Sequence, residues 1–219
     1  MTAAVASPDR RPTLLEGISV FLITWYGFST VWWNTPLHFL HGPYVGSWSQ
    51  HVWMAVVPLA CCAVFGRRIP LGSFRRAELQ RWIVPGVATL ALSVLGLFIV
   101  YLSPLRPLLA SQSRHGPGSL LFEAIAPGLG EEVLFRGWLQ TALNRSFPRV
   151  GTFVASLAFG YIHLSNQGPS AFVHFVGAYS VLIGLGLGIG YARSGNLWIA
   201  IILHNVADLL NMAILAVLP

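Results

Sequence analysis

The sequence has no lysine, few charged residues of either sign and only two cysteines. All 13 basic residues are arginines, and charged residues make up 9% of the 219 positions. Soluble globular domains carry about 25% charged residues, so the composition argues against that class. The cysteines, Cys61 and Cys62, are adjacent in an apolar segment. This spacing suits neither a disulfide framework nor a C-x-x-C metal or redox site.

Long apolar runs are what the sequence has instead. Hydrophobic residues make up 55% of the chain and the mean hydropathy is +0.66. An apolar run of about 20 residues is what a helix needs to cross a bilayer. The composition therefore predicts an all-α, polytopic transmembrane helical bundle of about seven spans (six to eight). The expected spans are 14–35, 50–66, 82–103, 119–143, 150–165, 170–192 and 197–217.

The positions of the arginines predict the orientation of these spans. With seven spans and a cytoplasmic N-terminus, ten arginines fall on the cytoplasmic side, two fall outside, and Arg136 falls within a span. Membrane proteins show this positive-inside bias. The net charge of +6 is thus explained by topology, and no nucleic acid partner is expected. We expect an integral membrane protein, with the arginine-only composition favouring a prokaryotic cell membrane.

The loops divide the expected spans into two groups. A polar cytoplasmic N-terminus, residues 1–13, precedes three spans within 14–103. The Pro/Gly/Ser-rich segment 104–118 is the expected external linker, and residues 119–219 form the expected catalytic core of four spans. The arginine-rich loop 66–81 is expected to rest on anionic lipid headgroups of the bilayer.

One run of glycines predicts close helix packing. The stretch "GLGLGIG" places Gly184 four residues before Gly188, and Gly186 four residues before Gly190. Small residues at this spacing let neighbouring membrane helices approach closely.

Ionisable residues gather in the second half of the chain. An ionisable residue at bilayer depth costs at least about 2.5 kcal/mol, so it marks a functional site by default. The first half offers little: Glu16, His38 and His51 lie near span ends. The ionisable residues expected inside the last four spans are Glu123, Glu131, Glu132, Arg136, His163, His174, His204 and Asp208. Of these, His174 is expected to be a packed or interfacial side chain.

Helical spacing separates the two adjacent carboxylates of "GLGEEVLFRG". Glu132 and Arg136 are four residues apart, so they share a helix face and are expected to form an ion pair. Glu131 is rotated by about 100° and can face a different neighbour. Pro127 and the two glycines that precede Glu131 are expected to loosen or break the helix there and to admit water.

Four side chains from three spans are expected to form one polar site: Glu131, His163, His204 and Asp208. Three chemistries are open to them. Glu131 and His163 could deprotonate a water that attacks a peptide carbonyl, with His204 and Asp208 stabilising the oxyanion. The same four side chains could hold a divalent metal such as Zn²⁺. They could also form a proton or metal transport path. The sequence has no H-E-x-x-H and no G-x-S-x-G, so it gives no support to a zincin or a serine hydrolase.

Three motifs at these residues resemble those of the CAAX-protease and bacteriocin-processing family of membrane proteins (CPBP, also called ABI). "EEVLFRG" resembles the family's E-E-x-x-x-R motif, and "FGYIH", Phe159 to His163, resembles its F-x-x-x-H motif. "SGNLWIAIILHNVAD", residues 194–208, resembles the last motif, a histidine with a polar residue four positions later. The resemblance covers about residues 119–210, and the first three spans carry no motif.

The resemblance implies a CAAX-protease-like intramembrane endopeptidase that acts on a membrane-embedded or membrane-anchored protein or peptide. By position, Glu131 would activate water and His163 would assist it, while His204 and the residue at 208 would shape the oxyanion site. The supporting residues would be Glu132, Arg136 and Phe159. The resemblance leaves open whether the reaction depends on a metal or on the glutamate alone.

Asp208 departs from the family pattern, which often has asparagine at this position. Asparagine can donate a hydrogen bond to an oxyanion, whereas an ionised aspartate cannot. Asp208 is therefore protonated, or it orients His204, or it ligates a metal. The alternative to a protease is a non-proteolytic family member that acts in bacteriocin immunity or partner binding, and a metal or proton transporter is a third class.

Overall fold

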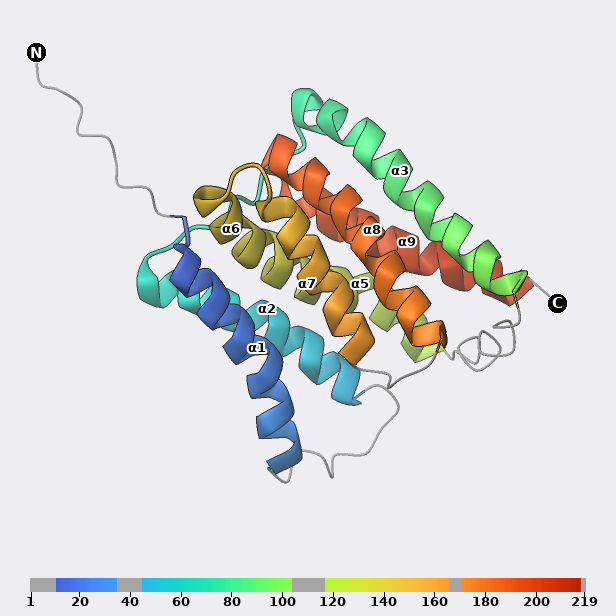
Figure 1. Cartoon of the computed structure of the whole chain (residues 1–219), viewed down its shortest axis with the longest axis horizontal. Helices are drawn as coiled ribbons and strands as arrows, with labels where there is room; N and C mark the ends of the chain where they lie inside the picture. The colour runs from blue at the N-terminus through green and yellow to red at the C-terminus, as the bar shows by residue number, and fades with distance from the viewer. Residues whose placement is uncertain (1–10, 35–44, 104–116, 166–170, 218–219) are drawn as a thin grey trace, which may run out of the picture.

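The computed structural model describes residues 11–34, 45–103, 117–165 and 171–217 as a bundle of helices (Figure 1). The elements are α1 (Leu14–Asn34), α2 (Val45–Phe65), α3 (Arg76–Tyr101), α5 (Pro117–Glu132), the π-helix η2 (Val133–Gln140), α6 (Thr141–Ser146), α7 (Gly151–Ser165), α8 (Ala171–Ser194) and α9 (Leu197–Val217). Because α5, η2 and α6 follow one another without a gap, the described residues form seven helical segments. No strand occurs among them, which confirms the all-α class.

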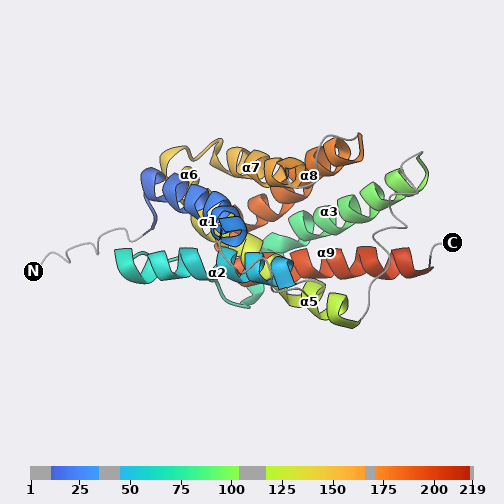
Figure 2. The same cartoon turned by 90° about the horizontal axis from the view of Figure 1, so that it is seen from below.

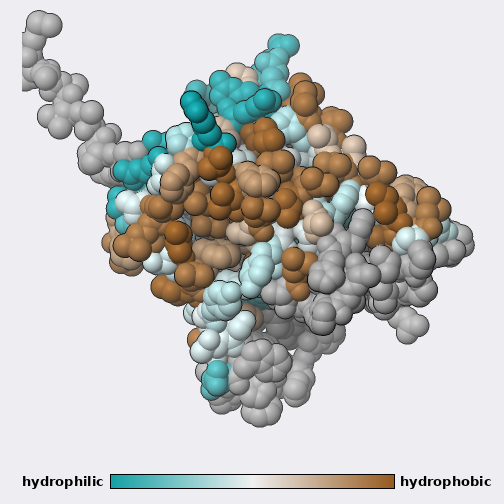
Figure 3. Space-filling view, in the orientation of Figure 1, coloured by the Kyte–Doolittle hydropathy of each residue, from teal (hydrophilic) through white to brown (hydrophobic). Residues whose placement is uncertain are grey.

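Within the described residues, four helices are long and apolar enough to cross a membrane. They contain the segments Leu14–Val31, Trp48–Phe65, Arg76–Tyr101 and Leu197–Val217. Apolar atoms also cover much of the face shown in Figure 3. Exposed large apolar side chains include Phe153, Leu157 and Leu182 on α7 and α8. An apolar exterior of this extent suits contact with lipid. The protein is a polytopic helical membrane protein, and the finer expectation of seven spans stays a prediction.

The helices form two layers with one helix at each flank (Figure 2). Helices α7 and α8 lie in one layer, and α2, α5 and α9 lie in the other. At one flank α1 contacts α2, η2 and α6, while at the other flank α3 contacts α8 and α9. The α5–η2–α6 segment contacts helices of both layers, so side chains on it can meet partners from either side.

Arginine side chains gather at one end of the bundle, which we call the basic end. Three contacts join helix ends there: Arg67 pairs with Glu16 at 2.7 Å, Arg145 donates to the carbonyl of Arg11 at 2.8 Å, and Arg81 donates to the carbonyl of Arg193 at 3.0 Å. Hydrophilic atoms concentrate at the same end of the molecule in Figure 3. The helical segments that follow one another therefore alternate in direction.

The predicted basic loop 66–81 is shorter than expected, because α3 already begins within it. Its remainder binds the turn between α8 and α9. The amide nitrogen of Asn196 donates to the carbonyl of Ser73 and, at 2.9 Å, to the carboxylate of Glu78. The amide oxygen of Asn196 accepts the backbone N–H of Ile199 at 3.0 Å and so caps α9. The loop is therefore anchored to the bundle by specific hydrogen bonds.

The glycines of α8 serve two neighbouring helices, as the spacing predicted. A side chain at Gly186 or Gly190 would collide with side chains of α3. A side chain at Gly184 or Gly188 would be crowded by side chains of η2 and α7. The two glycine pairs thus let α8 lie close to α3 on one face and to the η2–α7 pair on the other.

Candidate active site

The two adjacent carboxylates, Glu131 and Glu132, lie at the end of α5, directly before the π-helix. The expectation that Pro127 would break the helix is wrong: α5 continues through Pro127 to Glu132. The irregular segment comes afterwards, where all eight residues of η2 are buried. Such π-helical segments are frequent at functional sites.

The glycines before the carboxylates bring neighbouring helices close to them. A side chain at Gly128 would lie 2.5 Å from the amide oxygen of Asn205 in α9, and one at Gly130 would lie 2.6 Å from the carbonyl oxygen of His51 in α2. The backbone N–H of Gly128 also donates to the Asn205 amide oxygen at 2.7 Å. The two glycines therefore permit close approach, and they do not loosen α5.

Glu132 binds two partners and is completely buried. Its Oε1 lies 3.0 Å from Nη1 of Arg136, which confirms the predicted ion pair. The same oxygen accepts a hydrogen bond from Nδ1 of His204 at 2.8 Å. Arg136 in turn donates from Nη2 to the carbonyl of Gly184 at 3.2 Å. Glu132 thus fixes the ring of His204, a contact that the sequence did not indicate.

The ring of Phe159, in α7, contacts Arg136 and two histidines of the site. The guanidinium carbon of Arg136 lies 4.4 Å from the centre of this ring, a cation–π contact. The ring centres of His163 and His204 are 4.8 and 5.9 Å from that of Phe159. His163 donates from Nδ1 to the carbonyl of Phe159 at 2.8 Å, since a carbonyl only accepts. The Nε2 of a neutral His163 is then an acceptor.

Glu131 lies between two histidines. Its Oε1 is 3.3 Å from Nε2 of His51, and its Oε2 is 3.9 Å from Nε2 of His204. Oε2 is buried and has no hydrogen-bond partner within the described part of the chain. The same His204 nitrogen lies 3.5 Å from Oδ2 of Asp208. His204 therefore faces Glu132 with one nitrogen, and Glu131 and Asp208 with the other.

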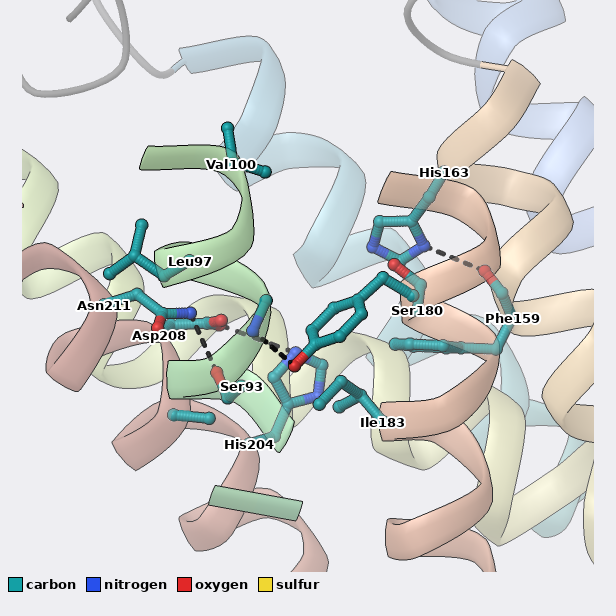
Figure 4. Close-up of a pocket in the computed structure, with 13 residues that line it drawn as sticks. Ser93, Leu97, Val100, Phe159, His163, Ser180, Ile183, His204, Asp208 and Asn211 are labelled. Atoms are coloured by element: carbon teal, nitrogen blue, oxygen red, sulfur yellow. Dashed lines mark hydrogen bonds and ion pairs between the residues drawn. The ribbon is translucent and has the colours of Figure 1, made fainter. Parts of the chain in front are cut away.

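A cavity of about 270 Å³ lies beside this group, between α3, α7, α8 and α9 (Figure 4). His163, His204 and Asp208 all line it. Other lining residues are Ser93, Leu97, Val100, Tyr179, Ser180, Ile183 and Asn211. The liquid volume per water is about 30 Å³, so the cavity has room for several waters or for a substrate side chain.

The family comparison agrees with this geometry. Residues 114–210 match the family model described as "Type II CAAX prenyl endopeptidase Rce1-like". These residues form an Rce1-like domain. The buried cluster of Glu131, Glu132 and His204 is consistent with the active site of this family. The searches of curated proteins and of solved structures gave no match.

The Rce1-like domain contains every residue that the sequence predicted for the site. The structure joins Glu131, Glu132, Arg136, His204 and Asp208 by direct contacts. His163 lines the same cavity, but its hydrogen bond goes to Phe159. The side chain of His174 and residues 1–10 and 104–116 lie outside the described parts.

The sequence interpretation missed His51, which was set aside as a residue near a span end. It lies in α2, outside the Rce1-like domain, and contacts Glu131. No motif marks this position. The one available signal was a histidine within a long apolar run, which at bilayer depth suggests function.

The metal interpretation receives no geometric support from the described residues. Among them, no three His, Cys, Asp or Glu side chains are arranged to hold a metal ion. A metal held by Glu131, His163, His204 and Asp208 therefore stays a prediction.

Proposed function

We propose that this protein is an intramembrane endopeptidase that hydrolyses a peptide bond in a membrane-embedded or membrane-anchored protein or peptide. One observation carries the proposal: the buried Oε2 of Glu131 has no hydrogen-bond partner in the described residues and lies near His204, inside an Rce1-like domain. The name of the matched family describes a prenyl endopeptidase, which supports peptide hydrolysis and a substrate at the membrane.

In the proposed reaction, Glu131 acts as the general base. Its Oε2 takes a proton from a water that lies between the carboxylate and the cavity, and the water oxygen attacks the scissile carbonyl carbon. His163 assists by accepting a hydrogen bond at Nε2, since its Nδ1 is held by Phe159. The proton then passes to the leaving nitrogen as the carbon–nitrogen bond breaks.

His204 stabilises the negative charge that develops on the carbonyl oxygen. With Nδ1 donating to Glu132, a protonated His204, whose side chain lines the cavity, keeps a second donor at Nε2–H. A donor fixed in advance at the position of an oxyanion is a large contribution to catalysis. Asp208, 3.5 Å from the same nitrogen, helps to orient the ring. Glu132 and Arg136 keep His204 in place.

We also propose that all seven helical segments cross the membrane, with the basic end in the cytoplasm. The alternating helix directions and the arginine contacts at one end support this topology. His204 follows the start of α9 by seven residues, so it lies about 10 Å along the helix from the basic end. The scissile bond would then be cut in the cytoplasmic half of the bilayer.

Proteoliposomes with two peptide probes test the proposal. One probe is a peptide with an S-farnesyl cysteine in a C-terminal CAAX sequence, and the other is the same sequence fused to a transmembrane segment. Mass spectrometry of the products identifies the cleaved bond. The parent should cut at least one probe, and Glu131→Gln should lower the rate by about 10²–10⁴-fold, the usual contribution of a general base.

Glu16→Gln is the matched control, because it makes the same change at the basic end, where Glu16 pairs with Arg67 and with no residue of the site. It should cleave at a rate within twofold of the parent. If Glu131→Gln cleaves as fast as the parent, the proposal is wrong and the non-proteolytic alternatives gain support. Loss of activity with 1,10-phenanthroline, restored by Zn²⁺, would instead contradict the metal-free reaction.

A further inference from the structure

We infer that His51 is a positioning residue: it holds one oxygen of Glu131 and so turns the other toward His204 and the cavity. The inference rests on the proposed role of Glu131. It adds to the site a residue of α2, which lies outside the Rce1-like domain.

The contact is within hydrogen-bond distance and largely buried. Nε2 of His51 lies 3.3 Å from Oε1 of Glu131, and the two side chains are 13% and 11% exposed. A carboxylate only accepts hydrogen bonds, so the imidazole donates from Nε2. Oε1 is thereby occupied, and Oε2 is the oxygen left to act on water.

The backbone is shaped to permit this contact. A side chain at Gly130 would lie 2.6 Å from the carbonyl oxygen of His51 and 2.9 Å from its Cα. Backbone atoms cannot move away as a flexible side chain can. The missing side chain at Gly130 therefore lets α2 lie against α5 one residue before Glu131.

An aromatic contact orients the imidazole ring. The ring of Phe122 in α5 meets that of His51 edge to face, with centres 5.2 Å apart and an interplanar angle of 83°. Phe122 is itself buried and meets Trp48 at 5.4 Å in the same manner. Edge-to-face contacts of this kind favour one relative orientation of the rings. The direction of Nε2 is therefore set by α5 as well as by α2.

The two oxygens of Glu131 thus have different surroundings. With His51 replaced by an apolar residue, the carboxylate could rotate and pair both oxygens with His204. The base would remain charged but would be misplaced, and a misplacement of about 1 Å can cost about 100-fold in rate. Substrate binding would be little affected, since neither His51 nor Glu131 lines the cavity.

Nitrogen-15 NMR of the histidines in lipid bilayers tests the contact without any substrate. His51→Gln removes one signal pair and so assigns it. Glu131→Gln should then shift the His51 ring nitrogens, whereas Glu16→Gln, which changes a carboxylate paired with Arg67 at the basic end, should leave them unchanged. Unchanged His51 signals in Glu131→Gln would overturn the inference.

Kinetics with the two peptide probes test the positioning role. His51→Met should lower kcat by about 10- to 100-fold and leave KM within twofold. His51→Gln should recover at least about tenfold of that loss, because its amide nitrogen can donate as Nε2 does. Gly130→Ala should lower kcat although His51 is still present.

If His51→Gln is as slow as His51→Met, His51 only fills space. The same conclusion follows if both variants cleave at the parental rate. If the parent cleaves neither probe, the proposed function has failed, and the NMR result alone decides whether His51 holds Glu131.

Discussion

At the scale of single residues, two neighbouring glutamates differ because their partners differ. Glu132 is 0% exposed and contacts Arg136 and His204 through one oxygen. Removing one partner of such a buried pair typically costs about 3–5 kcal/mol, since a charge is left without compensation. Glu131 has histidines on both sides, and one of its oxygens has no hydrogen-bond partner among the described residues. Glu132 therefore stabilises the site, and Glu131 is suited to chemistry.

Asp208 gives a prediction at the same scale. Its side chain is 30% exposed and lies 3.5 Å from Nε2 of His204. Asp208→Asn should keep at least about a tenth of the parental cleavage rate, because asparagine can orient His204 and can donate to an oxyanion. Asp208→Leu should lose about 100-fold or more. Rates of peptide cleavage in proteoliposomes measure both changes, and an equal loss in both would mean that the negative charge itself is required.

At the scale of helices, α5 is continuous although its sequence contains residues of low helix propensity. It contains Pro127, Gly128 and Gly130 within its last turns, yet it stays helical to Glu132. The glycines lie where α9 and α2 touch it. Contacts with neighbouring helices outweigh the weak helix propensity of glycine, which is about 1 kcal/mol below that of alanine.

Alanine at the α5–α9 contact should therefore destabilise the bundle. Gly128→Ala would place Cβ 2.5 Å from the Asn205 amide oxygen and 2.6 Å from the carbonyl oxygen of Ile201. Overpacking of this kind costs about 1–3 kcal/mol. Gly27→Ala in α1 is the matched control: its nearest neighbours would be 3.9 Å away, so helix propensity should make it neutral or stabilising. Unfolding in mixed detergent micelles compares them, and equal stability of the two variants would contradict this account.

The periodicity of the sequence predicted features that lie within a single helix. The span expected at 197–217 is α9, and the i, i+4 spacing gave the pair of Glu132 with Arg136. It could not predict His51, because the contact with Glu131 joins positions 80 residues apart. The role of Gly130 was missed for the same reason, since only the neighbouring helix shows why a side chain is excluded.

At the scale of the whole molecule, helices α1 and α2 precede the Rce1-like domain in the sequence and pack against it. Helix α2 supplies His51, and the indole nitrogen of Trp138 in η2 donates to the carbonyl of Glu16 in α1 at 3.0 Å. Ring contacts between Phe21 and Phe135 add to this interface, with centres 5.5 Å apart. The division into three N-terminal spans and a core of four spans stays a prediction, and contacts between the two parts include that of His51 with Glu131.

The proposed topology gives a prediction for the whole chain. In a background of Cys61→Ala and Cys62→Ala, a cysteine introduced by Arg149→Cys at the basic end should react with an impermeant maleimide only after the cells are permeabilised. A cysteine introduced by Ser111→Cys, in the predicted external linker, should react in intact cells. Mass shift on a gel measures both, and labelling of the two sites from the same side would refute the topology.

The π-helix makes the number of residues between Glu132 and α6 as important as their identity. Arg136 reaches back to Glu132, while Gln140, at the other end of η2, donates to the carbonyl of Gly188 at 2.8 Å. Deleting one residue between them would restore the ordinary helical repeat and rotate one end by about 100° against the other. Neighbouring side chains can adjust to a substitution, but both contacts cannot survive that rotation. An alignment gap at this point would therefore mark a relative whose site is built differently.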